Sequence, residues 1–296
     1  MTTKCNLILD SCCELPPEML KREGIFLLNY VYTLDGEVHV DDMYETLTPH
    51  EFFEGMRNGA QPQTSQLPMT MLAETFEQAM ASDKPTVFLS FASALTGTLD
   101  TARTVYEGLC AEHPDAQPVH IYDTKLAATA EGLFVYEALQ QWEKGLTAEE
   151  MLEWADKAAP HVNEMFVVDD LEALKRGGRI PKALAVIGSK LDVKPLLDID
   201  INDGSLRSCG LVRGKKKAIK QMVGLFTKTI PERDRTGRLV MIGNADSPED
   251  AKRLEEMLRK TATELRIIHC NIGPVIGSHV GPGMVSMVFW GPDSRK

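Results

Sequence analysis

TVFLSFASALTGT, residues 86–98, joins a strand-like run to a loop that carries three hydroxyl side chains. The first five residues are rich in β-branched and aromatic side chains and predict a buried strand. The loop that follows places its hydroxyl side chains around one glycine (Ser93, Thr96, Gly97 and Thr98). A helical spacing of apolar residues begins at residue 99. A strand, a short polar loop and a helix in this order are typical of a βαβ unit in a parallel sheet.

The same alternation of strand and helix patterns continues along the first half of the chain. Strand-like runs lie at 5–9, 25–33, 86–90, 118–122, 163–168, 193–199, 205–211, 238–243, 265–271 and 283–290. Helical spacing lies at 70–81, 99–112, 128–143, 148–159, 214–228 and 247–262, and a helix capped by Thr48 starts at Pro49. The alternation predicts an α/β fold with a largely parallel sheet in this half.

The second half has a different pattern. The strands at 193–199 and 205–211 flank the turn sequence Asn202-Asp203-Gly204, which predicts an antiparallel hairpin. A mixed sheet with helices on one face follows from this pairing. We therefore expect two domains, an N-terminal α/β domain over residues 1–160 and a C-terminal α+β domain over residues 161–296.

Composition excludes several classes of function. The formal charge of −11 argues against general binding of nucleic acid or anionic membranes. No apolar run reaches the roughly 18–20 residues that cross a bilayer, so stable membrane insertion is not expected. The segment MTTKCNLILDS resembles a first strand rather than a signal peptide, which indicates the cytoplasm. The six cysteines and seven histidines show no zinc spacing, so we expect free thiols and neither metal nor cofactor.

The loop at residues 92–98 is the first candidate site. Ligands of open α/β sheets lie at the carboxyl ends of the strands, where this loop belongs. Its backbone N–H groups at a helix start favour an anion, although simple capping by the hydroxyl groups explains the same residues. Ser93 lacks the glycines of a G-x-S-x-G elbow, and the loop lacks the lysine of a P-loop.

Three further stretches stand out. Thr64 and Ser65 lie on a loop between two helical segments, where helix capping is the simpler interpretation. Residues 273–283 contain four glycines and two prolines around His279, followed by Gly281. Arg179 lies in the segment Leu174–Ile180, and a basic stretch at 205–220 on an otherwise acidic chain includes Arg207, Arg213 and Lys215. Such a stretch is either a solvated helix face or a docking site for an acidic partner or a phosphorylated ligand.

Taken in order, these motifs resemble the DegV family over essentially the whole chain. The matching segments are Asp10-Ser11, Thr64-Ser65-Gln66, Ser93-x-Leu95-Thr96-Gly97-Thr98, Asp123-Thr124, Gly177-Gly178-Arg179-Ile180, Lys194-Pro195 and His279-x-Gly281-Pro282-Gly283. The resemblance implies a two-domain protein that buries one long-chain fatty acid between its domains. It also implies a separate ATP-dependent fatty acid kinase subunit, to which the bound carboxylate is presented for acyl-phosphate formation.

By the same resemblance, the carboxylate is held by Thr64, Ser93 and His279, with Ser65, Thr96, Gly97 and Gly281 around it. Several positions depart from the family pattern: Ala92, Leu67 before Pro68, Ala128, Ala130 and Pro181. These departures concern the shape of the pocket and, at Pro181, the docking of a kinase. Arg179, Arg207, Arg213 and Lys215 are the candidate docking residues.

Physical reasoning favours a carrier over an enzyme. A buried carboxylate needs hydrogen-bond donors, and two hydroxyl groups with an imidazole supply them. The chain has no nucleotide loop, so we expect no catalytic residues and place the chemistry on the partner kinase. Two alternatives stay open: a serine hydrolase or acyltransferase with Ser93 as nucleophile and His279 as base, and a regulatory module for another small anion.

Overall fold

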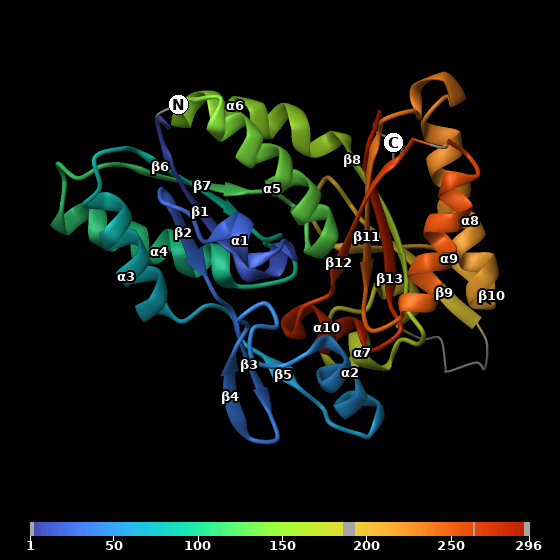
Figure 1. Cartoon of the computed structure of the whole chain (residues 1–296). Coiled ribbons are helices and arrows are strands. Elements are labelled where there is room, and N and C mark those ends of the chain that lie inside the picture. Colours follow the sequence, from blue (N-terminus) through green and yellow to red (C-terminus); the bar gives the residue numbers. More distant parts are fainter. Residues whose placement is uncertain (1–2, 186–192, 263, 293–296) are drawn as a thin grey trace.

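The fold is described by a computed structural model that covers residues 3–185, 193–262 and 264–292. Its strands form three sheets (Figure 1). They are β1 (Asn6–Asp10), β2 (Ile25–Leu28), β3 (Val31–Leu34), β4 (Glu37–Val40), β5 (Gln63–Thr64), β6 (Thr86–Ser90), β7 (Val119–Asp123), β8 (Val162–Val167), β9 (Val193–Ile199), β10 (Leu206–Arg213), β11 (Leu239–Asn244), β12 (Arg266–Asn271) and β13 (Val285–Trp290).

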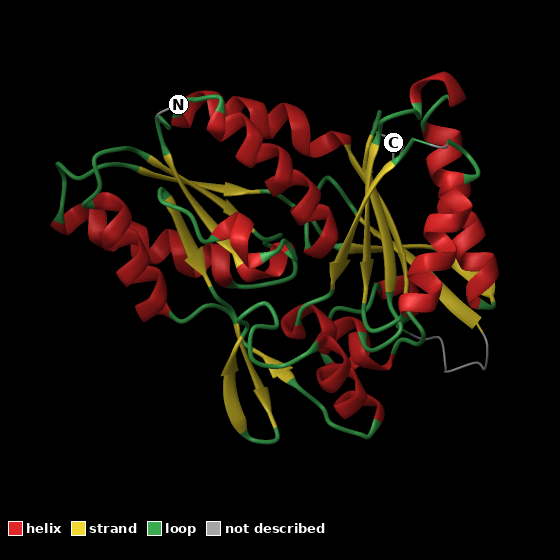
Figure 2. Ribbon diagram, viewed as in Figure 1, coloured by secondary structure: helices red, strands yellow, loops and turns green. Residues whose placement is uncertain are grey.

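The helices surround these sheets (Figure 2). They are α1 (Pro17–Leu20), α2 (Pro49–Arg57), α3 (Met69–Met80), α4 (Thr98–Glu112), α5 (Ala128–Glu143), α6 (Ala148–Ala158), α7 (Glu172–Arg176), α8 (Lys215–Thr229), α9 (Pro248–Arg259) and α10 (Pro274–Val280). Single 3-10 turns occur at Ser11–Cys13, Ala159–His161, Lys182–Leu184 and Glu232–Asp234. None of the helices in these described ranges is long and apolar enough to cross a membrane.

The first sheet is parallel, as the sequence predicts. Its strand order is β2-β1-β6-β7, and every neighbouring pair runs in the same direction. Ile8 and Phe88 point to the face covered by α3 and α4. Leu7 and Leu89 point to the opposite face, which α5 and α6 cover. This alternation buries both faces, which is why these strands are apolar throughout.

The second sheet is mixed, again as predicted. Its order is β10-β9-β8-β13-β11-β12, with β11 and β12 parallel and the other pairs antiparallel. The helices α8 and α9 cover one face. The other face meets α5, whose side chains form one cluster with Met241 and Val288. Because α5 lies between the two sheets, the expected division at residue 160 stays a prediction (Figure 1).

A small third sheet differs from the sequence-based expectation. The run at 25–33 was expected to be one strand, but it breaks after Leu28. Tyr30 hydrogen-bonds Ser11 and Asp41 there, which turns the chain out of the first sheet. The second part, β3, pairs with β4 and β5, two strands that the sequence did not indicate. Exposed positions in β4 and the two-residue length of β5 remove the usual periodic signal.

The glycine- and proline-rich stretch near the C-terminus forms a helix, α10. Pro274 occupies its first turn, and Gly281, with φ 73°, ends it. A Cβ at Gly277 would lie 2.8 Å from the Phe53 ring, so a glycine is required for α2 to pack here. This packing brings a segment of the N-terminal half against the helix that carries His279.

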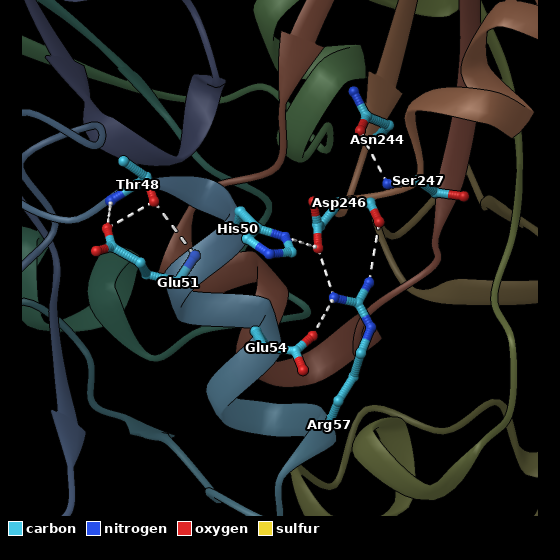
Figure 3. Close-up of polar contacts among 8 residues, drawn as sticks. All are labelled: Thr48, His50, Glu51, Glu54, Arg57, Asn244, Asp246 and Ser247. Atoms are coloured by element: carbon cyan, nitrogen blue, oxygen red, sulfur yellow. Dashed lines mark hydrogen bonds and ion pairs between the residues drawn. The ribbon is translucent and has the colours of Figure 1, made fainter.

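A polar cluster also attaches α2 to the C-terminal half (Figure 3). Thr48 and Glu51 form a capping box at the start of α2. Nδ1 of His50 lies 3.0 Å from Oδ2 of Asp246. Arg57 donates to the same carboxylate and to the Asp246 carbonyl oxygen. The position of α2, and through it that of α10, is therefore fixed by contacts between distant parts of the sequence.

Candidate ligand-binding site

Thr64 and His279 come together although 215 positions separate them in the sequence. Thr64 ends β5, where it pairs with Tyr32 of β3. His279 lies in the last turn of α10. Oγ1 of Thr64 and Nε2 of His279 are 2.7 Å apart. Two of the three residues expected to hold a carboxylate are thus direct neighbours.

The imidazole ring of His279 packs against Gly177, the first residue of the Gly177-Gly178-Arg179-Ile180 segment. A Cβ at Gly177 would lie 2.1 Å from Nδ1 of His279, so a side chain there would displace the ring. Burial, with Arg179 and Arg176 nearby, lowers the pKa of His279 to about 4. The ring is therefore neutral at pH 7. Its Nδ1 is buried and has no hydrogen-bond partner within the described ranges.

Arg179 joins the two loops that flank this pair. Its Nε and Nη2 donate to the carbonyl oxygen of Leu95 at 3.1 and 2.9 Å, and its Nη1 donates to that of Gly177. Both acceptors are neutral, and no carboxylate of the described residues forms an ion pair with Arg179. Its positive charge is consequently available to an anion beside His279.

In the loop at residues 92–98, Ser93 contacts an acid of the protein itself. The Ser93 hydroxyl donates to Oδ2 of Asp123 at 2.6 Å, and its backbone N–H donates to Oδ1. Ser93 is not among the residues that line the cavity described below. Its hydroxyl contacts a carboxylate of the protein itself, so its contact with a ligand stays a prediction.

The neighbouring residues of this loop do reach the site. Thr96 lines the cavity, and its Oγ1 lies 3.0 Å from Oγ1 of Thr98. Thr98 also accepts from the hydroxyl of Tyr30. Gly97 precedes α4, and a Cβ there would lie 2.3 Å from Oε1 of Gln66. The glycine therefore lets the Thr64–Gln66 loop pack against the start of α4.

A cavity runs inward from these residues. It encloses about 830 Å³ between its walls, counting the part open to solvent. Thr64, Ser65 and His279 line it together with Arg179. Its remaining surface is largely apolar, with contributions from Phe91, Leu95, Phe166, Leu174, Ile276 and Met284. Gly281 does not line it and instead ends α10.

Most of the expected docking residues are held by internal contacts. Arg207 forms a two-point ion pair with Asp198, at 2.9 and 2.6 Å. Lys215 donates to Asp169 at 2.8 Å and to the Gly283 carbonyl oxygen, and its side chain is 12% exposed. Arg213 is exposed at the end of β10, next to the exposed Lys216. Of the four, Arg213 is the exposed residue, whereas Arg207 is half-buried and ion-paired.

Sequence reasoning missed a buried acid cluster behind the site, formed by Asp10, Glu14, Asp41 and Glu131. Burial raises the pKa of Asp10 and Asp41 to about 7, and raises those of Glu14 and Glu131 well above their usual range. Glu14 accepts from the Gly273 backbone N–H at 2.6 Å, immediately before α10. Asp10 belongs to a family segment, but Glu14, Asp41 and Glu131 carry no sequence motif, so only the fold reveals that the four acids are buried.

Two alternatives can be compared with this geometry. A serine hydrolase requires a hydrogen bond from Ser93 to His279, but Ser93 donates to Asp123 and His279 contacts Thr64. A binding module for a compact anion requires a small polar pocket, whereas this cavity is mainly apolar. No cluster of potential metal ligands occurs within the residues that the structure describes.

The fold and the site together define an α/β protein with a largely apolar cavity that is lined at one part by a threonine–histidine pair. The chain belongs to the DegV family: the family model, described as "Uncharacterised protein, DegV family", matches residues 4–291. A DegV domain-containing protein from Clostridium perfringens is 34% identical over 288 residues, which are 97% of this chain and 98% of the relative. A second, from Lactococcus lactis, is 31% identical over 293 residues, 98% and 99% of the two chains.

Solved structures show the same architecture. A DegV family protein from Thermus thermophilus, described for its fatty acid binding, has a TM-score of 0.84 and 27% identity, covering 97% of this chain and 99% of the other. A Thermotoga maritima protein described as revealing a fatty acid binding function has a TM-score of 0.80 and 26% identity, covering 98% and 100%.

Proposed function

We propose that this protein binds one long-chain fatty acid, with its carboxylate beside Thr64 and His279 and its acyl chain in the apolar cavity. The observation that most supports this ligand is the Thr64–His279 contact. Both residues line a largely apolar cavity, and Arg179 lines it with them. The fatty acid binding described for the Thermus and Thermotoga relatives supports the same ligand class.

The chemistry of the head group fits a carboxylate. A buried carboxylate is costly unless donors satisfy its oxygens. The Thr64 hydroxyl and the neutral His279 ring are such donors, since a neutral imidazole keeps one N–H. Arg179 adds a positive charge that the described residues do not neutralise. An anion at this position is favoured, whereas an uncharged ester would lose the electrostatic part of the attraction.

The acyl chain supplies most of the affinity. At ~0.8 kcal/mol for each buried methylene, a tail of about 16 carbons yields roughly 12 kcal/mol before the costs of association. Phe91, Leu95 and Ile276 all line the cavity. A shorter chain leaves part of this apolar surface without contact, so affinity rises with chain length until the cavity is filled.

We further propose that the bound carboxylate is presented to a separate, ATP-dependent fatty acid kinase subunit. Phosphoryl transfer requires Mg-ATP held in line with a carboxylate oxygen, and the sequence contains no nucleotide loop. Ser65 and Gln66 are exposed next to Thr64, so the carboxylate end of the cavity is the end nearest to solvent. Arg213 is the candidate contact for that partner.

Mass spectrometry tests the ligand proposal. The purified protein is denatured and extracted, and the delipidated protein is then titrated with palmitate and oleate. We expect about one fatty acid for each chain and saturable rebinding. A protein that releases no fatty acid and binds neither added acid contradicts the proposal. Release of a compact anion in its place supports the regulatory alternative.

A further inference from the structure

Besides the Thr64–His279 contact, one further part of the cavity wall is polar. Thr129 of α5, Ser286 of β13 and Glu164 of β8 line the cavity together. Their exposed fractions are 1%, 3% and 5%. Thr129 belongs to the first turn of α5, the helix that lies between the two sheets (Figure 1). Buried hydroxyl and carboxyl groups beside an otherwise apolar ligand space require an explanation.

The two hydroxyl groups form a short chain that ends in an unused donor. Ser286 accepts from the Gly243 backbone N–H at 3.1 Å and donates to Oγ1 of Thr129 at 3.0 Å. The hydroxyl hydrogen of Thr129 has no acceptor within the described part of the protein. A Cβ at Gly243 would lie 2.2 Å from Oγ1 of Thr129 and 2.5 Å from Oγ of Ser286. The local backbone is thus shaped around both hydroxyl groups.

The beginning of α5 adds further donors to the same wall. Ala127 and Ala128 line the cavity, and no side chain caps the helix at Ala127. The first N–H groups of an α-helix have no partner inside the helix. Ala128 also has a φ of 51°, an unusual conformation for a residue with a side chain. The N–H groups of Ala130 and Glu131 donate to the Ala127 carbonyl oxygen, which leaves those of Ala128 and Thr129 as the additional donors in this described part of the wall.

A plain hydrocarbon chain cannot accept these hydrogen bonds, but an oxygen atom on the chain can. We infer that the preferred ligand is an oxygenated long-chain fatty acid, whose in-chain hydroxyl or keto oxygen accepts from Thr129. This inference rests on the proposed fatty acid function and narrows its ligand class. A hydroxyl group suits the wall best because it also donates, and the Glu164 carboxyl group lies on the same wall.

A purely structural role for the Thr129–Ser286 pair makes a different prediction. If the pair serves only to attach α5 to the second sheet, its loss weakens folding but leaves ligand preference unchanged. If the wall recognises an oxygen atom, its loss removes the preference. A site built to bind a hydroxyl group discriminates strongly against the analogue that lacks it.

Competition binding to the delipidated full chain separates these cases. Stearate, 10-hydroxystearate and 12-hydroxystearate are compared on the wild type, Thr129→Val and Thr129→Ser. We expect at least one hydroxystearate to bind about tenfold more tightly than stearate to the wild type, as one added hydrogen bond predicts. Thr129→Val should bring this ratio to about one, and Thr129→Ser should keep it. Thr86→Val is the matched control, because Thr86 is a fully buried threonine that does not line the cavity.

Three results overturn the inference: stearate binding at least as tightly as both hydroxystearates, a ratio unchanged in Thr129→Val, or an equal loss in Thr86→Val. Circular dichroism confirms that each variant is folded, and Thr129→Ser retains a test if Thr129→Val does not fold. Failure of the wild type to bind any of the three acids contradicts the proposed function as well, and so is a distinct outcome.

Discussion

Gly177 and His279 are in such close contact that a Cβ at position 177 would lie 2.1 Å from the imidazole Nδ1. The glycine belongs to the loop after α7, and the histidine to α10. The absence of a side chain at one residue thus sets the position of the ring at the other. That position brings Nε2 within 2.7 Å of Thr64.

Gly177→Ala should weaken fatty acid binding by about tenfold or more, because the displaced ring loses its contact with Thr64 and with the carboxylate. The φ of Gly177 is −77°, so the effect does not come from backbone strain. Gly224→Ala is the matched control, since nothing lies within 4 Å of a Cβ at that helical position. Titration with palmitate measures both variants, and equal affinities would contradict the account.

His279→Gln should change how stability depends on pH. The pKa of His279 is about 4 in the folded protein and about 6.5 in the unfolded chain. Between these values only the unfolded chain binds the proton, so the wild type loses stability as the pH falls from 6.5 to 4. The glutamine variant lacks this loss. Urea unfolding at pH 7 and pH 5 should show the variant gaining relative to the wild type at pH 5; a constant difference would refute the assignment.

Glu131→Gln tests a pH dependence of stability whose sign is opposite to that of His279. Both carboxyl oxygens of Glu131 are buried and have no hydrogen-bond partner in the described ranges, and burial raises its pKa well above the usual range. The folded protein keeps a proton that the unfolded chain releases above pH 4 to 5. Wild-type stability therefore falls as the pH rises, by at most about 1.4 kcal/mol per pH unit from this group.

The glutamine variant should thus be more stable than the wild type, and by more at pH 8 than at pH 6. Thermal unfolding across this range gives the comparison. Glu256→Gln, at a residue of α9 that is not buried, serves as the control and should show no such trend. A Glu131→Gln variant that loses stability as the pH rises, relative to wild type, would contradict a protonated carboxyl group.

Asp246→Asn tests the attachment of α2 (Figure 3). The pKa of Asp246 is lowered by its contacts with Arg57 and His50, although burial opposes this. Asparagine tolerates the φ of 50° at this position, so the variant removes charge and little else. We expect a loss of about 0.5–1 kcal/mol in unfolding free energy, since the pair is partly exposed. The same loss in high salt would argue against an electrostatic origin.

Much of the fold can be predicted from the periodic spacing of apolar residues along the sequence. The parallel first sheet, the 193–199 hairpin and helices such as 128–143 match the structure because each buries a regular apolar pattern. The short elements could not be predicted from the spacing of apolar residues. The break after Leu28 depends on hydrogen bonds to Ser11 and Asp41, and α10 depends on packing against α2, so neither is encoded locally.

The site, too, could be predicted only in part from the sequence. Glycine- and hydroxyl-rich motifs indicated the loops around Thr64, Ser93 and His279 without indicating which side chains meet. The structure pairs Thr64 with His279 and gives the Ser93 hydroxyl to Asp123. Arg207 pairs with Asp198 on the neighbouring strand of its hairpin, and Lys215 pairs with Asp169, 46 positions away. Charge runs reveal cations but not the acids that neutralise them.

A crystal structure of the delipidated protein soaked with palmitate tests the central claim most directly. The account predicts one palmitate in the cavity, with its carboxylate within hydrogen-bond distance of Oγ1 of Thr64 and Nε2 of His279. The acyl chain should contact Phe91 and Leu95. A carboxylate bound at the beginning of α5, or a palmitate outside the cavity, would contradict it.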